Sequence, residues 1–447
     1  MTKDMTKGSP LRLILGFAFP MLLGMLFQQF YNLVDTMIVG KTLGVSALAG
    51  VGATSSINFM IIGFCMGICS GFAIPVAQQF GAGKYSELRK YVFNGYVCSA
   101  VFAVVMTILS VVFCAPILRL LNTPDDIFMH AYNYIVIIFA GIPTVFLYNI
   151  VSGIIRSLGD SKTPVYFLVL SSVINIALDF ILILYVKMGV AGAGVATVVS
   201  QLIAGVGCTI YMYKKFDILK GTKQEKVISK KHISNLCFIG VPMGLQYSIT
   251  AIGSVVLQTA VNRLGSTAVA AVASGGKLAM FFCCPFDAMG STMSTYAGQN
   301  LGAQKLDRVD KGIFACSGLA LVYSVIACAV LLFTGQYLAL LFVDGTETRL
   351  IEMIAAFLRW NCIFYFPLAL VNIVRFTIQG LGFGKLAILA GVCEMAARSI
   401  VGFYFVPVFG FTAACLASPI AWILADVFLI PAYFLVVRHL KRELCMS

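Results

Sequence analysis

The sequence predicts an all-α integral membrane protein in which twelve transmembrane helices form two six-helix bundles. Three observations support this fold class. The chain is 60% hydrophobic and only 11% charged, whereas soluble domains carry about 25% charged residues. Its apolar stretches reach the length of about 20 residues that a helix needs to cross a bilayer, and the two halves of the chain resemble each other in sequence.

Apolar runs interrupted by Gly, Pro and charged residues define the spans in order. Between the two sets of six lies the longest polar segment, residues 214–232, which contains seven lysines. We therefore expect an N-terminal lobe at 1–213, a basic linker at 214–232 and a C-terminal lobe at 233–447. The predicted spans are 11–40, 46–80, 88–115, 127–156, 164–186 and 189–213 in the first lobe, and 233–262, 267–300, 306–334, 350–380, 385–407 and 411–437 in the second.

The basic residues are distributed as topology signals. If both termini face the cytoplasm, 22 of the 31 Lys and Arg residues fall in cytoplasmic segments and 5 in outer loops, which agrees with the positive-inside rule. The net charge of +13 therefore indicates orientation in the membrane rather than nucleic-acid binding. We expect a multi-pass protein of a bacterial-type inner membrane, with both termini in the cytoplasm.

The two halves contain matching motifs at a nearly constant offset. Residues 149–159 (NIVSGIIRSLG) match 372–382 (NIVRFTIQGLG) at six of eleven positions, and 78–84 match 299–305 at four of seven. Because each half has an even number of spans, equivalent helices cross the membrane in the same direction, and the halves are predicted to be parallel repeats. That architecture is typical of carriers that work by alternating access to a central site.

Two carboxylates of the first half are isolated within predicted spans. Asp179 follows Asn175 by four residues, which places both side chains on one helix face. Asp35 is the only charged residue between Arg12 and Lys41. A charged side chain in the bilayer centre costs about 3 kcal/mol on insertion scales, and such residues usually face a cavity or an ion pathway. We therefore predict that Asp35 and Asp179 face each other.

The chemistry of this pair suits either of two ions. Burial and mutual repulsion both favour the protonated form of neighbouring carboxyl groups, so the pair could load and release a proton. Alternatively, oxygen atoms of Asp35, Asn175 and Asp179 could coordinate Na⁺. The residue types do not distinguish these ions, and no other cofactor is expected. The competing interpretation is structural: both acids would only bond to neighbouring helices.

Three motifs carry a resemblance to a known family: VDT at 34–36, QQFGAG at 78–83 and RSLGD at 156–160. With its twelve spans, the chain resembles the multidrug and toxic compound extrusion (MATE) transporters along its full length. The resemblance is to the branch whose cation site lies in the N-terminal lobe, since the span-7 glutamate and span-10 aspartate of the other branch are missing here. It implies a proton or sodium site made of Asp35, Asn149, Asn175, Asp179 and Thr197.

The same resemblance implies a secondary active antiporter that exports amphipathic, mostly cationic drugs or toxins in exchange for H⁺ or Na⁺. Two of the five implied site residues have counterparts in the second half, because Asn149 recurs as Asn372 and Thr197 as Ser418. These two could instead bridge helices within each bundle.

A third acid, Asp287, lies in a predicted span of the second half among aromatic residues. It could hold an organic cation by charge and by attraction to aromatic faces. The alternative is an ion pair with Lys277 or Arg375. The candidate substrate-binding residues are Asp287, Gln246, Phe281 and Tyr31.

The remaining polar residues of the second half have less specific interpretations. Glu394 and Arg398 are four residues apart on one predicted helix and are expected to pair. Asp426 has no partner that the sequence identifies. The fourteen cysteines are scattered through apolar spans without a C-x-x-C pair, so we interpret them as packing residues rather than metal ligands.

Three other classes of protein fit the sequence less well. A flippase for lipid-linked precursors would need a strongly basic cavity for pyrophosphate, whereas the first lobe offers two acids. A non-transporting receptor or channel would not need the repeat. An enzyme is not expected, because no nucleophile with its base, metal ligand set or phosphate loop is found. We expect a monomer in the lipid bilayer that binds small amphipathic cations and no nucleic acid.

Overall fold

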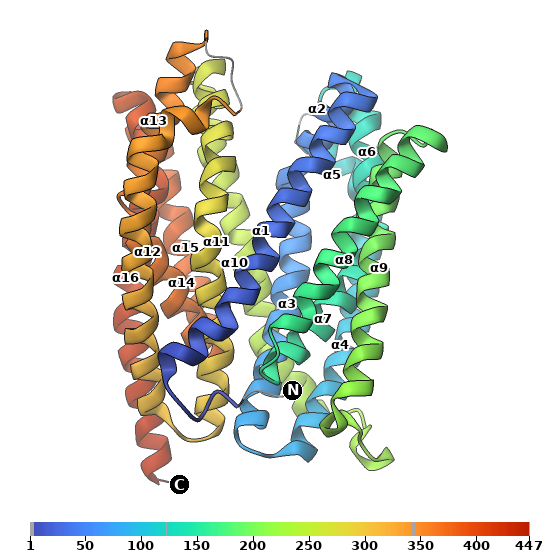
Figure 1. Cartoon of the computed structure of the whole chain (residues 1–447), viewed down its shortest axis with the longest axis vertical. Helices are drawn as coiled ribbons and strands as arrows, with labels where there is room; N and C mark the ends of the chain where they lie inside the picture. Colours follow the sequence, from blue (N-terminus) through green and yellow to red (C-terminus); the bar gives the residue numbers. More distant parts are fainter. Residues whose placement is uncertain (1–3, 122, 342–345, 447) are drawn as a thin grey trace. The chain divides into compact units, whose positions relative to one another are not determined.

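The computed structural model describes residues 4–121, 123–341 and 346–446 as helices joined by short loops (Figure 1). The chain divides into two compact units. Unit 1 consists of Leu23–Ser248 with Met1–Asp4, and unit 2 consists of Ile249–Ser447 with Met5–Leu22. The unit borders fall inside two long helices, and the lobe boundaries at residues 213 and 233 stay a prediction.

The helices of unit 1 run side by side along its length, from α3 in blue to α9 in green (Figure 1). Helix α1 (Pro10–Leu43) contributes its second half and α10 (Lys230–Asn262) its first half. The others are α2 (Val45–Ala53), α3 (Ser55–Gly81), α4 (Tyr85–Val112), α5 (Cys114–Leu120), α6 (Asp125–Ala140), α7 (Ile142–Ser157), α8 (Lys162–Asp179), the π-helical η1 (Phe180–Tyr185), α9 (Val190–Lys215) and the short η2 (Asp217–Leu219) and η3 (Lys223–Glu225).

Unit 2 repeats this succession of long helices. It contains the rest of α10 and α1, and its long helices also run alongside one another (Figure 1). Its other elements are α11 (Ser266–Gly302), α12 (Leu306–Ala339), α13 (Thr348–Cys362), α14 (Tyr365–Gly380), α15 (Gly384–Ile400), the π-helical η4 (Val401–Phe405) and α16 (Val406–Met446).

Twelve membrane crossings can be assigned to the described residues. Nine helical stretches are long and apolar enough to cross, and the bent pairs α6–α7 and α13–α14 add two more. One of the nine, Gly384–Leu444, has 61 residues, which is about 90 Å of helix, three times the hydrocarbon thickness of about 30 Å. It breaks at Gly410, where φ is 60° and ψ is −138°, and therefore makes two crossings. The predicted all-α fold with twelve spans is confirmed.

Three predicted spans differ from the structure in detail. The stretch predicted at 46–80 is two helices, α2 and α3, separated at Thr54. The spans predicted at 127–156 and 350–380 are broken helices, bent by 47° between α6 and α7 and by 51° between α13 and α14. Proline explains both breaks, because Pro143 and Pro367 lie in the first turns of α7 and α14, where a proline starts a helix more readily than it continues one.

The sequence repeat extends to unusual backbone features. The two bends occur at equivalent places, and the π-helical segments η1 and η4 begin at residues 180 and 401, which are 221 residues apart. Gly189 and Gly410, at the same offset, have φ of 62° and 60°, in the left-handed region that glycine adopts without a penalty. These matches support the prediction that the halves are repeats of one six-helix unit.

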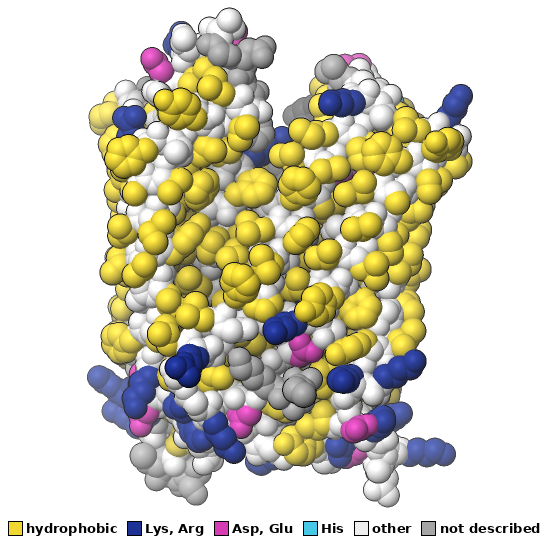
Figure 2. Space-filling view, in the orientation of Figure 1, with side chains coloured by type: hydrophobic (Ala, Val, Ile, Leu, Met, Phe, Trp, Pro, Cys, Tyr) yellow, Lys and Arg dark blue, Asp and Glu magenta, His cyan; other side chains and the backbone are white. Residues whose placement is uncertain are grey.

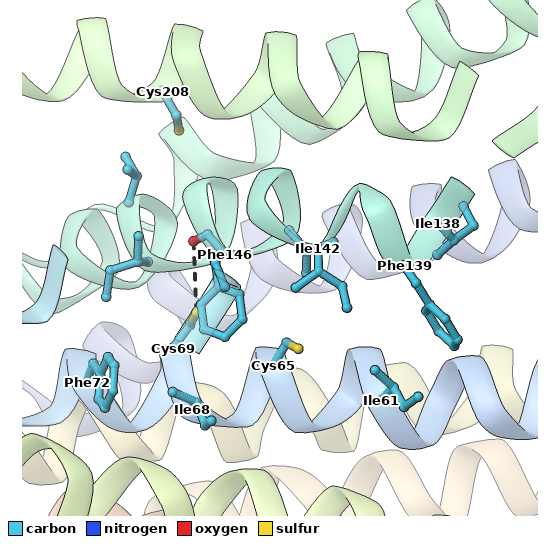
Figure 3. Packing of buried hydrophobic residues seen from close by; sticks show 14 of the residues in the cluster. Ile61, Cys65, Ile68, Cys69, Phe72, Ile138, Phe139, Ile142, Phe146 and Cys208 are labelled. Carbon is cyan, nitrogen blue, oxygen red and sulfur yellow. Dashed lines mark hydrogen bonds between the residues drawn. The ribbon is translucent and has the colours of Figure 1, made fainter. Parts of the chain in front are cut away.

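The core of unit 1 is built where α3 faces α6 and α7 (Figure 3). Cys65 and Cys69 are fully buried there, and the Cys69 thiol donates a weak hydrogen bond to the Phe146 carbonyl at 3.9 Å. The cysteines of the described residues are free, so these two act as small apolar core residues, as predicted. The side chains that share this core include Ile61, Ile68, Phe72, Ile138, Phe139, Ile142 and Phe146.

The basic linker is held against α4 within unit 1. Arg89 donates to both carboxylate oxygens of Glu225, at 2.7 and 2.6 Å, and to the Ile218 carbonyl at 3.1 Å. The Asn94 side chain bonds to the backbone at Val227 and Ser229. The Arg89 guanidinium holds the pKa of Glu225 at about 2, below its usual range. The linker is therefore docked by specific polar contacts.

Candidate functional site

Helices α1, α6, α8 and α9 of unit 1 bring together the two isolated acids of the first half. The carboxyl groups of Asp35 on α1 and Asp179 on α8 lie within hydrogen-bonding reach of each other. Asp35 is 9% exposed and Asp179 is fully buried. Residues 144 positions apart in the sequence thus form one buried carboxyl pair, as the sequence predicts.

Asn175 links this pair to the next helix. It lies one turn before Asp179 and is buried. In the orientation that satisfies both ends of its amide, Asn175 Nδ2 donates to Asp179 Oδ2 at 3.0 Å and its oxygen accepts from the Thr197 backbone N–H at 3.0 Å. The Thr197 hydroxyl donates to the Ala193 carbonyl at 3.0 Å. Asn175 therefore fixes Asp179 and joins α8 to α9.

The backbone around Asp179 is irregular. Asp179 is the last residue of α8, and the π-helical turn η1 follows it directly. A π-helical turn widens the helix by one residue, and such turns occur frequently at functional sites. Compared with a continuous α-helix, this turn rotates the residues that follow Asp179 about the helix axis. Asp179 therefore lies where the α-helical segment ends and the π-helical segment begins.

Two tyrosines complete the polar cluster. The hydroxyl group of Tyr31, one turn before Asp35 on α1, hydrogen-bonds to the Thr197 side chain. Tyr134 on α6 is buried and lies close enough to both acids to interact with their charges. The sequence assigned Tyr31 to substrate binding and gave no role to Tyr134. The sequence contains one indication of a role for Tyr134: a tyrosine in an apolar run usually needs a polar partner for its hydroxyl group when it is buried.

The acid pair has no counter-ion in the described part of the chain. Asp35 Oδ1 and Asp179 Oδ1 are buried there without a hydrogen-bond donor. The described residues also contain no group of three or more His, Cys, Asp or Glu side chains that could hold a metal ion. Two adjacent buried carboxylates repel each other, and a proton or a small cation would neutralise them. The oxygen atoms of Asp35, Asp179 and the Asn175 amide are the donor type suited to either ion.

Asn149 lies apart from this hydrogen-bonded group. Its amide donates to the Val145 carbonyl, one turn earlier on α7, at 2.8 Å. Among the described residues no hydrogen bond joins it to Asp35 or Asp179. The structure therefore brings together four of the five residues implied by the resemblance, and Asn149 bonds within its own helix.

The predicted substrate-binding residues belong to different units. Tyr31 and Gln246 lie in unit 1, whereas Phe281 and Asp287 lie on α11 in unit 2. Asn372 Nδ2 on α14 donates to Asp287 Oδ1 at 3.1 Å. Asp287 is exposed on α11, so its carboxylate can meet a solute.

The second half also contains a buried ion cluster. Glu394 on α15 pairs with Arg398, one turn later, at 3.5 Å, which confirms the predicted pair. It also accepts a hydrogen bond from Arg375 on α14. Arg375, one of the two cations considered for Asp287, thus pairs with Glu394 and acts on Asp287 electrostatically. Asp426 is buried on α16, and its Oδ1 has no hydrogen-bond donor among the described residues.

The fold and the buried acid pair define the class: a polytopic membrane transport protein built from two repeats. The family model MatE matches residues 20–181 and 242–405, and the chain belongs to this family of MATE transporters, which are not enzymes.

Two relatives and one solved structure illustrate the similarity. The probable multidrug resistance protein YoeA of Bacillus subtilis (strain 168) is 30% identical over 377 residues, which cover 82% of this chain and 81% of that protein. The probable multidrug resistance protein YpnP of the same organism is 31% identical over 382 residues, covering 83% and 82%. A crystal structure of MATE in complex with MaL6 has a TM-score of 0.91 at 21% identity and covers 99% of this chain and 100% of that one.

Proposed function

We propose that this protein is a secondary active antiporter that exports amphipathic, mostly cationic compounds in exchange for H⁺ or Na⁺. Its coupling site is the pair Asp35 and Asp179, with Asn175 and Thr197 in support. The observation that carries the proposal is the buried contact between two carboxyl groups without a counter-ion among the described residues. The names of the relatives YoeA and YpnP, both probable multidrug resistance proteins, support the class of substrate.

Coupling follows from the electrostatics of the pair. With both acids ionised, repulsion between Asp35 and Asp179 favours separating α1 from α8. A proton or Na⁺ between them removes the repulsion and draws these helices together, with Asn175 holding Asp179 in place on α8. Exchange of the ion with the aqueous phase thus changes the shape of unit 1, and alternating access would convert this change into release of the substrate.

The remaining parts of the proposal concern substrate and setting. An organic cation would be held within unit 2 by the Asp287 carboxylate near Phe281. The protein would act as a monomer, because one chain carries both repeats and a complete acid pair. It would lie in a bacterial-type inner membrane with both termini in the cytoplasm, as the excess of Lys and Arg in the segments on that side supports.

The test is transport of ethidium into or out of reconstituted vesicles, driven by an imposed pH gradient or an imposed Na⁺ gradient. Asp35→Asn and Asp179→Asn should each reduce gradient-driven transport to the level of protein-free vesicles, because Asn cannot load or release a proton. Each variant keeps the size and hydrogen-bonding capacity of the side chain. Gradient-driven transport that persists in both variants would refute the coupling role.

A matched control separates coupling from the general loss of a buried acid. Asp426→Asn removes a buried carboxylate from unit 2 and should leave the response to the gradient intact. The ratio of wild-type rates under the two gradients identifies the coupling ion. If neither gradient drives wild-type transport of ethidium or of other amphipathic cations, antiport of such compounds is wrong even if the acids prove essential for folding.

A further inference from the structure

A long apolar groove runs along the outside of unit 2. It has a volume of about 960 Å³ and lies between α12 and α16, with α14 as its floor. Its surface is mostly apolar. The side chains that form its middle section include Phe314 and Ser317 of α12, Leu370 and Val374 of α14, and Phe434 and Val437 of α16.

The groove is open on the side that faces the lipid. Phe314 is 75% exposed and Phe434 is 59% exposed, although both lie on membrane-spanning helices. On α16 the lining extends from Ile430 to Arg442, about 18 Å at 1.5 Å per residue. Half of the hydrocarbon core is about 15 Å thick. The groove therefore has the length of an acyl chain in one leaflet.

One end of the groove is basic. Arg438, Lys441 and Arg442 line it on the last turns of α16, and Figure 2 shows Lys and Arg side chains gathered at the end of unit 2 that carries the C-terminus, beyond its hydrophobic face. Lys441 is already engaged, because it bonds to Asp307 at 3.0 Å and Asp310 at 3.1 Å.

Among the described residues, the acids near this end already have partners, whereas Arg438 and Arg442 have no carboxylate partner. Tyr433 donates to Asp310, and Glu443 pairs with His439 at 3.2 Å. In the described part of the chain no carboxylate pairs with Arg438 or Arg442. Two guanidinium groups that no described carboxylate pairs with thus lie at one end of an apolar groove, just beyond residue 437, where the last span is predicted to end.

We propose that this groove is a binding site for an anionic phospholipid. The phosphate lies on Arg438 and Arg442, and an acyl chain lies along Phe314, Leu370 and Phe434. Guanidinium groups bind phosphate oxygens by paired hydrogen bonds, and basic pockets between transmembrane helices at the membrane surface are sites for anionic headgroups. The ligand has the opposite charge to the substrates proposed above, so this site is separate from transport of organic cations.

The test measures which lipids stay bound to the purified protein. The wild-type protein in detergent is mixed with equal amounts of phosphatidylglycerol and phosphatidylcholine that carry the same acyl chains, and retained lipids are counted by native mass spectrometry. Each of the two arginines that would hold the phosphate contributes about a fivefold preference for anionic lipid. We expect phosphatidylglycerol to be retained more than tenfold over phosphatidylcholine, and Arg438→Gln/Arg442→Gln to bring the ratio to about 1.

The matched control is Lys214→Gln/Lys215→Gln, which removes two exposed basic residues from the last turn of α9 in unit 1 and should leave the ratio unchanged. Position is tested with Phe314→Trp, whose added fluorescence should be quenched more by brominated phosphatidylglycerol than by brominated phosphatidylcholine. Equal retention of both lipids by the wild type, an unchanged ratio in the Arg variant, or an equal loss in the Lys control would each overturn the proposal.

Discussion

A close crossing between two helices of unit 1 predicts that adding one methyl group will destabilise the protein. Helices α3 and α10 meet through glycines spaced four residues apart, Gly67 and Gly71 on α3 and Gly240 and Gly244 on α10. A Cβ atom added to Gly71 would lie 2.4 Å from the Cα atom of Gly240, and one added to Gly67 would lie 2.6 Å from the Met243 carbonyl oxygen. Small residues at this spacing let helix backbones touch.

The magnitude follows from these distances. Carbon atoms pack best at about 3.5–4.0 Å, so Gly71→Ala forces the two backbones more than about 1 Å apart. Overpacking a core costs about 1–3 kcal/mol, and the upper value applies because the obstacle is backbone rather than a flexible side chain. Alanine recovers up to about 1 kcal/mol through its helix propensity. We expect Gly71→Ala to lower the free energy of unfolding by about 2 kcal/mol.

The assay is unfolding in mixed micelles, followed by the loss of helical circular dichroism as denaturant is added. Gly318→Ala on α12 is the matched control, because a Cβ atom there would meet no heavy atom within 4 Å. It should be as stable as the wild type, or more stable by up to about 1 kcal/mol. The reasoning about this crossing is refuted if Gly71→Ala is as stable as Gly318→Ala.

Two further predictions concern the linker and one concerns the ion cluster of unit 2. Arg89→Leu removes the bonds to Glu225, and trypsin should cut the linker roughly fivefold faster than in the wild type; an unchanged rate would show that these bonds do not dock it. Because the pKa of Glu225 is lowered to about 2, its stabilising contribution is complete above its ordinary pKa of about 4.5 and is lost as the pH falls towards 2. Hydrogen exchange of residues 217–225, corrected for the intrinsic rate, should show protection at pH 5 that disappears near pH 2, and protection that survives at pH 2 would contradict this account. Glu394→Gln leaves Arg375 and Arg398 buried without their carboxylate and should destabilise the protein by about 3–5 kcal/mol, whereas Glu394→Leu/Arg398→Met should recover part of that loss; an equally stable single variant would show that the cluster is solvated.

Length and apolarity were sufficient to predict the spans, because hydrocarbon leaves a backbone few ways to satisfy its hydrogen bonds. The bends had a local signal in Pro143 and Pro367, which an apolar window does not detect. The π-helical turns η1 and η4 had none, since they depend on packing between helices rather than on propensity. The docking of Glu225 on Arg89 was equally hidden, because it joins residues 136 positions apart.

The residues of the candidate site that could be predicted are those whose charge is unfavourable inside a membrane span. An isolated acid such as Asp35 is visible because nothing else explains a charge in a membrane span. Tyr134 was missed because a tyrosine in an apolar run is as readily a core residue as a site residue. The role of Asn175 as a bridge to Thr197 depends on the packing of α8 against α9, and spacing alone places Asn175 only on the same face as Asp179.

The two repeats share a backbone arrangement but place different charges on their equivalent helices. In unit 1 the helix before the π-helical turn carries Asn175 and Asp179, and no cation pairs with the acid in the described residues. In unit 2 the equivalent helix carries Glu394, whose charge is neutralised by Arg375 and Arg398. A neutralised acid gains little from binding a proton, whereas an acid beside another acid gains a great deal. The same fold therefore supplies one unit with an acid pair that no described cation neutralises and one unit in which the corresponding helix carries a neutralised acid, which is the asymmetry that the proposed coupling through unit 1 would use.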